Sequence, residues 1–272
     1  LNIFHSFLEI CWSQGLITIA KSNLWMRMNL DNQTVSTSGT IKYTFDGQTR
    51  AGHAVISDPV SSGTREKVIT KEDRTLEFLK KTVRRIYEAI KVTENKLYVE
   101  FPQIVPELPE TIHFISSQEL LDLYPELSAK EREDAVTRKF GAVFIIGIGG
   151  VLSDGKAHDG RAADYDDWEL NGDLLLWDNI LEHALEISSM GIRVDEASML
   201  RQLKIKGEEW KKDLSFHKKL LGGELPYTIG GGIGQSRLCM FLLRKAHIGE
   251  IQSSIWPDDM RTQCSEAGIT LV

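Results

Sequence analysis

The segment Gly230–Arg237, with the sequence Gly-Gly-Gly-Ile-Gly-Gln-Ser-Arg, constrains the fold of this chain more than any other. The residues before it, Pro226–Ile229, predict a strand, and the apolar spacing of Leu238–Leu243 after it predicts a buried helix. Glycines let a flat group lie against the backbone because they carry no side chain. Arg237 begins the predicted helix, where its planar guanidinium can stack on a ring or bind phosphate oxygens. The segment therefore predicts either a nucleotide platform or a tight strand-to-helix turn with a structural arginine.

A second informative segment is Glu186–Arg193, which follows an apolar run. Side chains alternate between the two faces of a strand, so Glu186, Ser188 and Met190 are predicted to share one face until Gly191 allows a bend. A carboxylate and a hydroxyl close together suit Mg²⁺, and an arginine just beyond them can bind a substrate carboxylate with two hydrogen bonds.

Four carboxylates lie just upstream, in Asp164–Trp168 and Asn171–Asp173, ahead of the apolar run Leu174–Trp177. An acidic loop before a buried strand is often only a solvated turn. Here the acidic residues stand between other candidate site segments, and metal-bound ATP would account for so many carboxylates near a phosphate platform. We therefore favour a functional interpretation.

Taken together, these segments resemble asparagine synthetase type A, the ammonia-using aspartate–ammonia ligases. The segments that carry the resemblance are Asp164–Trp168, Leu170–Asp173, Glu186–Arg193 and Gly230–Arg237, with support from Ile146–Gly150, Ser153–Gly155, His158–Arg161, His247–Glu250 and Ile255–Pro257. The spacing of Glu186, Ser189 and Arg193 is also similar to that in aspartyl- and asparaginyl-tRNA synthetases. The resemblance implies an α/β (α+β) fold of the class II aminoacyl-tRNA synthetase type, with a mainly antiparallel sheet flanked by helices.

The reaction that the resemblance implies has two steps. ATP and L-aspartate give a β-aspartyl adenylate and pyrophosphate, and ammonia then displaces AMP to give L-asparagine. The implied partners are therefore L-aspartate, ATP and ammonia, with Mg²⁺ as the metal cofactor and a homodimer as the assembly.

The resemblance also assigns roles in binding the nucleotide and the metal. Arg237 would contact the adenine or the phosphates, and Gly232 and Gly234 would leave room for the nucleotide. The residues that would hold or orient the metal, directly or through water, are Asp173, Glu186 and Ser189.

For the amino acid, the resemblance implies that Arg193 binds a carboxylate of aspartate. Asp166 and Ser188 would line the same site, with Asp166 a candidate for contacting the ammonium group of aspartate or the incoming ammonia. The residues expected to act in catalysis are Asp166, Arg193 and Arg237.

The first 64 residues do not follow the family pattern. Where the family has Asp-Gln-Trp-Asp-Trp-Glu, this chain has Ser61–Glu66, and the substrate-binding lysine and the arginine that meets the α-phosphate have no recognisable counterparts upstream. We therefore expect a divergent segment at 1–64 and a class II synthetase-like catalytic domain at 65–272. A segment translated in a shifted reading frame is one hypothesis for the divergence.

Composition sets further limits. A chain of 272 residues with 42% hydrophobic and 26% charged residues suits one large domain. The net charge of −7 argues against a nucleic-acid surface. Cys11, Cys239 and Cys264 lack metal-ligand spacing, which indicates reduced thiols and a cytoplasmic protein. The opening residues Leu1–Ala20 are too polar to span a membrane and lack the basic start of a targeting signal.

Hydrophobic periodicity outlines the secondary structure, with Ser116 or Ser117 and Ser128 as helix N-caps. Residues 33–60 are predicted to form a hairpin or to be disordered. The predicted helices cover residues 71–98, 119–123, 130–140, 194–203 and 208–221, and the predicted strands cover 112–115, 142–148, 174–177 and 226–229.

Two other functions remain open from the sequence. A tRNA-charging enzyme of the same fold would need an anticodon-binding part and a basic surface, which this chain lacks. A truncated or non-catalytic synthetase-like domain would bind nucleotide or amino acid without turnover, in keeping with the divergent first segment.

Overall fold

The computed structural model describes residues 38–45, 48–55 and 63–272, with side chains from residue 66 onward. The chain divides into two compact units. Ser62–Arg85 and Glu107–Val272 make up the larger unit. The other unit contains Ile86–Pro106 and the antiparallel pair β1 (Ser38–Phe45) and β2 (Gln48–Val55), which confirms the hairpin expected between residues 33 and 60.

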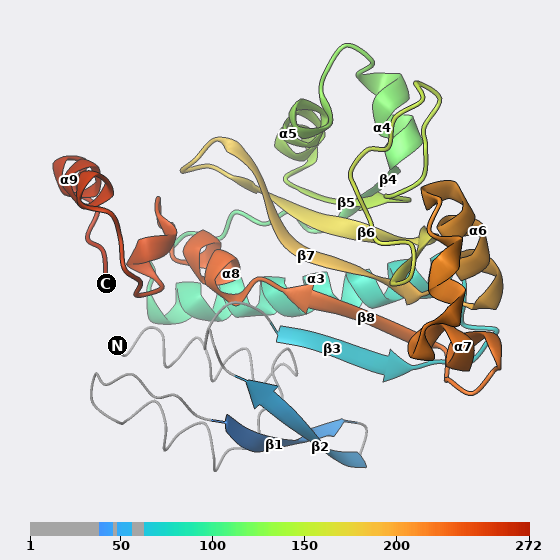
Figure 1. Ribbon diagram of the computed structural model, residues 1–272. Coiled ribbons are helices and arrows are strands. Elements are labelled where there is room, and N and C mark those ends of the chain that lie inside the picture. The colour runs from blue at the N-terminus through green and yellow to red at the C-terminus, as the bar shows by residue number, and fades with distance from the viewer. Residues whose placement is uncertain (1–37, 46–47, 56–62) are drawn as a thin grey trace. The chain divides into compact units, whose positions relative to one another are not determined.

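The larger unit is built on a six-stranded sheet with the strand order β3-β8-β7-β6-β5-β4. Every neighbouring pair is antiparallel except β4 and β5, so the expectation of a mainly antiparallel sheet is confirmed (Figure 1). The strands are β3 (Gly63–Val68), β4 (His113–Ser116), β5 (Ala142–Ile146), β6 (Asp166–Asp178), β7 (His183–Arg193) and β8 (Thr228–Ile233).

Two strands extend well beyond their predicted bounds. The prediction ended one strand at Ile229, but Gly230–Gly232 also lie inside β8. They stay extended because β8 pairs with β3 on one side and β7 on the other. Strand β6 begins at Asp166 rather than at Leu174, so much of the acidic segment is paired backbone and not a solvated loop.

Helices α4 (Ser117–Leu123) and α5 (Ala129–Phe140) begin where their N-caps predicted. The hydroxyls of Ser116 and Ser128 accept hydrogen bonds from the third backbone amide of each helix, and a glutamate at that position closes the capping box. Such caps satisfy backbone groups that the helix itself cannot.

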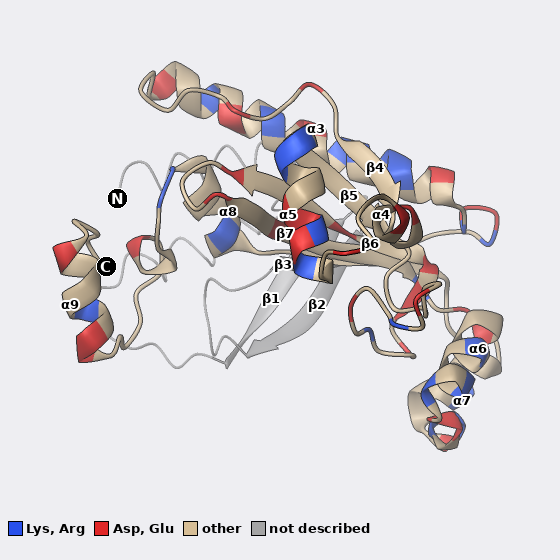
Figure 2. Ribbon diagram, turned by 90° about the horizontal axis from the view of Figure 1, so that it is seen from above, with Lys and Arg blue, Asp and Glu red and all other residues tan. Residues whose placement is uncertain are grey.

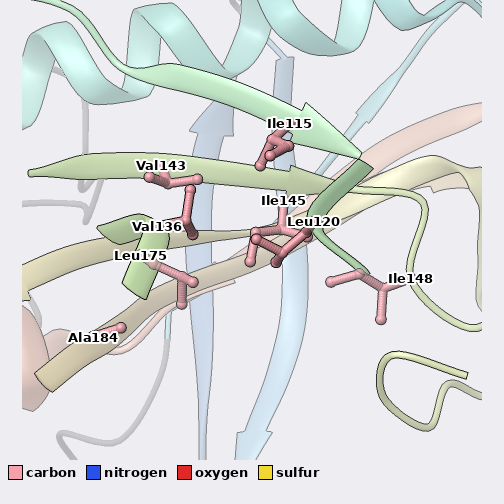
Figure 3. Packing of buried hydrophobic residues seen from close by; sticks show 8 residues of the cluster. All are labelled: Ile115, Leu120, Val136, Val143, Ile145, Ile148, Leu175 and Ala184. Atoms are coloured by element: carbon pink, nitrogen blue, oxygen red, sulfur yellow. The ribbon is translucent and has the colours of Figure 1, made fainter. Parts of the chain in front are cut away.

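Both helices lie over one face of the sheet, above it in Figure 1. Their apolar side chains pack against β4, β5, β6 and β7 in a buried cluster (Figure 3). The cluster consists of Ile115, Leu120, Val136, Val143, Ile145, Ile148, Leu175 and Ala184. This packing anchors the outer half of that face.

The segment predicted as one helix over 208–221 is two: η1 (Glu209–Asp213) and α7 (Ser215–Leu221). Leu214 separates them because its backbone is extended. Leu220 of α7 packs with Met199 and Leu203 of α6 (Glu196–Lys206) in a buried cluster that contains Trp168. The remaining helices are α3 (Leu76–Glu100), α8 (Gln235–Leu242), η2 (Ile248–Glu250) and α9 (Asp258–Glu266).

Charges of both signs are interspersed along α3 and α5 in Figure 2. The basic residues of α3 therefore do not form an uninterrupted stripe of one sign. Within the described ranges, no helix has both the length and the apolarity needed to cross a membrane.

Candidate active site

The pairing of β6 with β7 decides which side chains face the same way. Directly paired residues of an antiparallel pair point to the same face. Asp173 pairs with Ser189 and Leu175 pairs with Glu186, with a register shift between them that leaves Ile187 as an extra residue. Because of this bulge, Glu186 shares a face with Ser189 instead of Ser188. We call this face, which carries Asp173, Glu186, Ser189 and Arg193, the charged face.

The prediction that Glu186, Ser188 and Met190 share one face is therefore wrong. Ser188 pairs with the buried Leu174, on the opposite face from Asp173. Strict alternation fails here because a bulge reverses the order of faces beyond it. A role for Ser188 in the amino-acid site remains a prediction, but its side chain starts from the other side of the sheet.

Asp173 lies at the centre of the charged face and is almost completely buried. Its Oδ2 accepts a short hydrogen bond from the Nη2 of Arg161, while its Oδ1 has no hydrogen-bond partner. Burial raises the pKa of Asp173 above its usual value, and the neighbouring Arg161 and Ser189 oppose the rise. A buried carboxylate oxygen without a partner is unusual and calls for a ligand.

Glu186 extends this acidic group towards β8. Burial raises its pKa, and the nearby charge of Asp173 raises it further, while Arg237 opposes the rise. The two carboxylates therefore repel each other across the sheet, and a cation placed between them would relieve that repulsion.

Arg193 and Asp166 form a buried ion pair at the end of β7. Arg193 also contacts the Glu66 carboxylate of β3, with 3.0 Å between Nε and Oε1, and donates from Nη2 to the Tyr165 hydroxyl at 2.8 Å. Its guanidinium carbon lies 3.9 Å from the centroid of the Tyr165 ring. The arginine is thus held in one orientation by groups from two segments of the chain, Glu66 of β3 and the adjacent residues Tyr165 and Asp166.

Gly191 makes room for this pair. A Cβ atom there would lie 2.7 Å from the Cβ of Asn171 and 2.9 Å from the carboxyl carbon of Asp166. Neither approach is tolerated by packed atoms, so the position requires glycine for close contact.

Arg237 lies in the first turn of α8, as predicted, beside the end of β8. Its Nη1 donates to the backbone oxygen of Glu186 at 3.1 Å and lies 3.7 Å from the Glu186 carboxylate. The side chain is 52% exposed, so its guanidinium can still reach a ligand. Its stem lies over Gly234, where an added Cβ would be 3.5 Å from the arginine carbons.

Gly232 pairs with Ser189 on one side and with Thr64 on the other. It therefore continues the row of Asp173 and Ser189 across the sheet and adds no side chain to it. The structure brings Gly232, Gly234 and Arg237 to the same end of the sheet as Glu186 and Ser189.

The arrangement is a chain of neighbouring charges that alternate in sign except at Asp173 and Glu186, which are both acidic. It runs from Glu66 through Arg193, Asp166, Arg161, Asp173 and Glu186 to Arg237. Within the described part of the chain, no three His, Cys, Asp or Glu side chains converge closely enough to hold a metal by themselves. Mg²⁺ is commonly held by one or two carboxylates together with substrate phosphates. Asp173 and Glu186 can supply the two carboxylates.

The sequence did not single out Arg161, Tyr165 or Glu66 for a role in this chain of charges. Arg161 was part of a segment that carries the resemblance, but no chemistry was attached to it. Arg74 also went unnoticed: its Nη2 lies 2.9 Å from Asp167, and its Nε lies 3.2 Å from Asp195. These pairings join residues far apart in sequence, and only the tertiary structure reveals them.

Solved structures with this arrangement of sheet and helices are class II aminoacyl-tRNA synthetases. An asparaginyl-tRNA synthetase of Entamoeba histolytica, solved with asparaginyl-adenylate, matches with a TM-score of 0.51 and 16% identity, over 91% of this chain and 64% of that one. The enzyme of Pyrococcus horikoshii matches with a TM-score of 0.50 and 13% identity, over 91% and 66%. At these identities the likeness establishes the fold, and the expected class II fold is confirmed.

Sequence comparison narrows the class to one family. The sequence model of aspartate–ammonia ligase matches residues 22–268. The aspartate–ammonia ligase of Parabacteroides distasonis is 58% identical over 216 residues, which cover 76% of this chain and 63% of the relative. That of Clostridium perfringens (strain SM101 / Type A) is 60% identical over 207 residues, covering 76% and 62%. The chain belongs to the aspartate–ammonia ligase family.

The chain spans about 63% of the length of these curated relatives. The family model begins its match at residue 22, well before residue 65, where the resemblance was expected to start. The division into 1–64 and 65–272 remains a prediction.

Proposed function

We propose that this chain catalyses the ATP-dependent amidation of L-aspartate with ammonia, through a β-aspartyl adenylate, to give L-asparagine, AMP and pyrophosphate. Membership of the aspartate–ammonia ligase family supports the reaction. The observation that carries the proposal is the gathering of Asp173, Glu186, Ser189 and Arg193 on one face of the sheet. The proposed metal-binding carboxylates and the arginine proposed for the substrate carboxylate start from that face, and Arg237 of α8 lies beside it.

In this proposal the amino acid binds near Arg193. Its guanidinium matches a carboxylate with two parallel hydrogen bonds, which is the geometry that arginine favours. The carboxylates of Asp166 and Glu66 contact this guanidinium in the structure, which shows that it accommodates acidic partners. Asp166 would then turn to the ammonium group of aspartate. The buried ion pair would thus hold Asp166 and Arg193 in place until the amino acid binds to both.

The nucleotide would lie along β8 towards Arg237. Gly232 and Gly234 leave the backbone uncovered there, and the exposed guanidinium of Arg237 can stack on the adenine or bind phosphates. The positive charge would offset the negative charge that builds up on the phosphates as the adenylate forms.

The residues present fit a bound Mg²⁺. Asp173 has a buried oxygen without a partner, and Glu186 lies close enough for its charge to be felt there. We propose that these two carboxylates, with Ser189 orienting Asp173, hold Mg²⁺ together with the phosphates. When bound, the ion would neutralise phosphate charge and orient the triphosphate.

The direct test is turnover. The purified chain would be incubated with L-aspartate, ATP, Mg²⁺ and ammonium while AMP and asparagine are measured. Formation of both in equal amounts, dependent on aspartate and ammonium, supports the proposal. AMP release that requires tRNA would instead indicate a tRNA-charging enzyme.

A second candidate function is binding of nucleotide and amino acid without turnover. It is favoured by one observation: the chain spans only about 63% of the length of its curated relatives. Saturable ATP and aspartate binding with no asparagine formed would establish it.

We further propose a cytoplasmic location and a homodimeric assembly. Cys239 and Cys264 are buried and form no disulfide, which agrees with a reducing compartment, whereas Cys11 lies outside the described residues. Sedimentation analysis of the full chain would test the dimer.

A further inference from the structure

The loop between β5 and β6, residues 147–165, is fixed to the rest of the larger unit at several points. Near its start, Gln118 of α4 donates to the Ser153 hydroxyl at 2.8 Å and accepts from the Ser153 amide at 2.9 Å. Near its end, Asp164 lies 3.0 Å from His217 and 3.4 Å from Lys211. Between these anchors, the fully buried His158 lies 3.1 Å from Glu133 of α5.

Arg161 is the residue that this loop brings to the charged face. It is only 18% exposed, and its Nη2 donates to Oδ2 of Asp173, which is 6% exposed. Its Nη1 contacts Asp159 of the same loop, a side chain that is 63% exposed. The guanidinium thus has one buried partner on the sheet and one exposed partner on its own loop.

The charge of Arg161 acts on the same carboxylate that has an unpartnered buried oxygen. The positive charge of Arg161 acts to lower the pKa of Asp173, and it also acts to lower the pKa of Asp166 and of Glu186. A monovalent cation already bound to a carboxylate repels a second cation that approaches it. Asp173 can therefore bind a metal ion tightly only when Arg161 moves away, or when anionic phosphates offset the positive charge of Arg161.

We propose that Arg161 is the counter-ion of Asp173 in the nucleotide-free protein and that it is exchanged for the metal. When the metal–triphosphate complex binds, the guanidinium leaves Asp173, keeps its contact with Asp159 and turns to the phosphates. The metal site is thereby kept weak until nucleotide is present. This inference rests on the proposed function only in assuming that Asp173 meets the bound metal.

A permanent structural ion pair is the competing explanation. In that case removal of the guanidinium would only destabilise the protein and would loosen any metal bound to Asp173. Counter-ion exchange predicts the opposite sign for metal binding without nucleotide: removal of Arg161 frees Asp173 and strengthens binding of the metal alone.

The experiment is a titration of the full chain with Mn²⁺ in the absence of nucleotide, with free Mn²⁺ followed by electron paramagnetic resonance. Arg161→Gln is expected to bind Mn²⁺ about tenfold more tightly than the unaltered protein, within the usual range for coupled sites. Arg161→Lys, which keeps the charge, is expected to stay within about threefold of the unaltered protein. Adding Asp173→Asn to Arg161→Gln should abolish the gain.

Arg201→Gln is the matched control, because it removes the same charge from a side chain that is 44% exposed and pairs with Asp167 and Glu169. It should leave Mn²⁺ binding unchanged. Equal or weaker Mn²⁺ binding by a folded Arg161→Gln protein, or a gain shared by Arg201→Gln, overturns the proposal. Circular dichroism establishes folding, and Arg161→Lys provides the comparison if Arg161→Gln does not fold. Because the titration uses no aspartate and no turnover, its outcome is separate from that of the asparagine assay.

Discussion

Asp166 and Arg193 are both buried and charged, so each depends on the other. Burial raises the pKa of Asp166 even though Arg193 opposes the rise. Removing one member of such a pair leaves an uncompensated charge in the interior, which is more destabilising than the intact pair is stabilising.

Asp166→Ala is therefore expected to lower the free energy of unfolding by about 3–5 kcal/mol, because Arg193 is left with Glu66 and Tyr165 alone. Urea denaturation measures this change. Asp159→Ala is the control: its carboxylate is largely exposed and should change stability by less than about 1 kcal/mol. Equal effects of the two substitutions would show that the Asp166 pair is not a buried, dependent one.

Gly191 tests how closely the site is packed. Gly191→Ala should destabilise the protein by about 1–3 kcal/mol, since the new methyl group would overlap Asn171 and Asp166. Gly160→Ala, at a position with no heavy atom within 4 Å of the added carbon, should be nearly neutral in the same thermal unfolding experiment. A harmless Gly191→Ala would contradict the placement of Asp166 against β7.

At the residue scale, the sequence identified the types of group in the site better than their partners. Glu186, Ser189, Arg193 and Asp173 were predicted as site residues, and the structure brings them to one face. Their partners Arg161 and Glu66 could not be predicted, because ion pairs between distant segments leave no local pattern.

At the scale of helices and strands, the sequence predicted the features that depend on hydrogen bonds between residues close together in the chain. The serine N-caps, Ser116 or Ser117 and Ser128, predicted two helix starts because the hydroxyl of an N-cap bonds to a backbone amide only a few residues along the chain. The bulge at Ile187 was missed because it depends on how β7 meets β6, and it reversed the face assigned to Ser188. The glycines of β8 were missed as strand for the same reason.

One element also carries a pH dependence. His113 of β4 stacks on Phe140 of α5, with 3.7 Å between ring centroids. Burial lowers the pKa of His113 below its usual 6.5, the charge of Lys139 lowers it further, and Glu119 opposes the shift. Below pH 6.5 the unfolded chain therefore takes up this proton more readily than the folded one, so the stability present above that pH is lost as the pH falls towards the lowered value.

His113→Phe keeps the ring and removes the titration. The unaltered protein should lose more stability than His113→Phe between pH 8 and about pH 5, as measured by thermal unfolding at each pH. Identical losses for the two proteins would mean that His113 titrates alike in both states.

At the scale of the whole molecule, family membership and the class II fold are established, while the activity of this chain remains a proposal. The curated relatives align with 76% of the chain, and side chains before residue 66 are not described. The sequence predicted no recognisable counterparts of the family's substrate lysine and α-phosphate arginine in that region. The fold of the catalytic domain was predictable because long motifs of the family persist in order from about residue 65.

The central claim is that the charged face and the neighbouring end of β8 bind ATP with its metal. Isothermal titration of the full chain with Mg²⁺–ATP, in parallel with Arg237→Ala and Arg201→Ala, tests this claim most directly. We predict saturable binding to the unaltered protein and to Arg201→Ala, and at least about tenfold weaker binding to Arg237→Ala, because a charge-assisted contact to phosphate is lost. Binding that is equal in all three folded proteins, or absent from the unaltered one, would contradict the account.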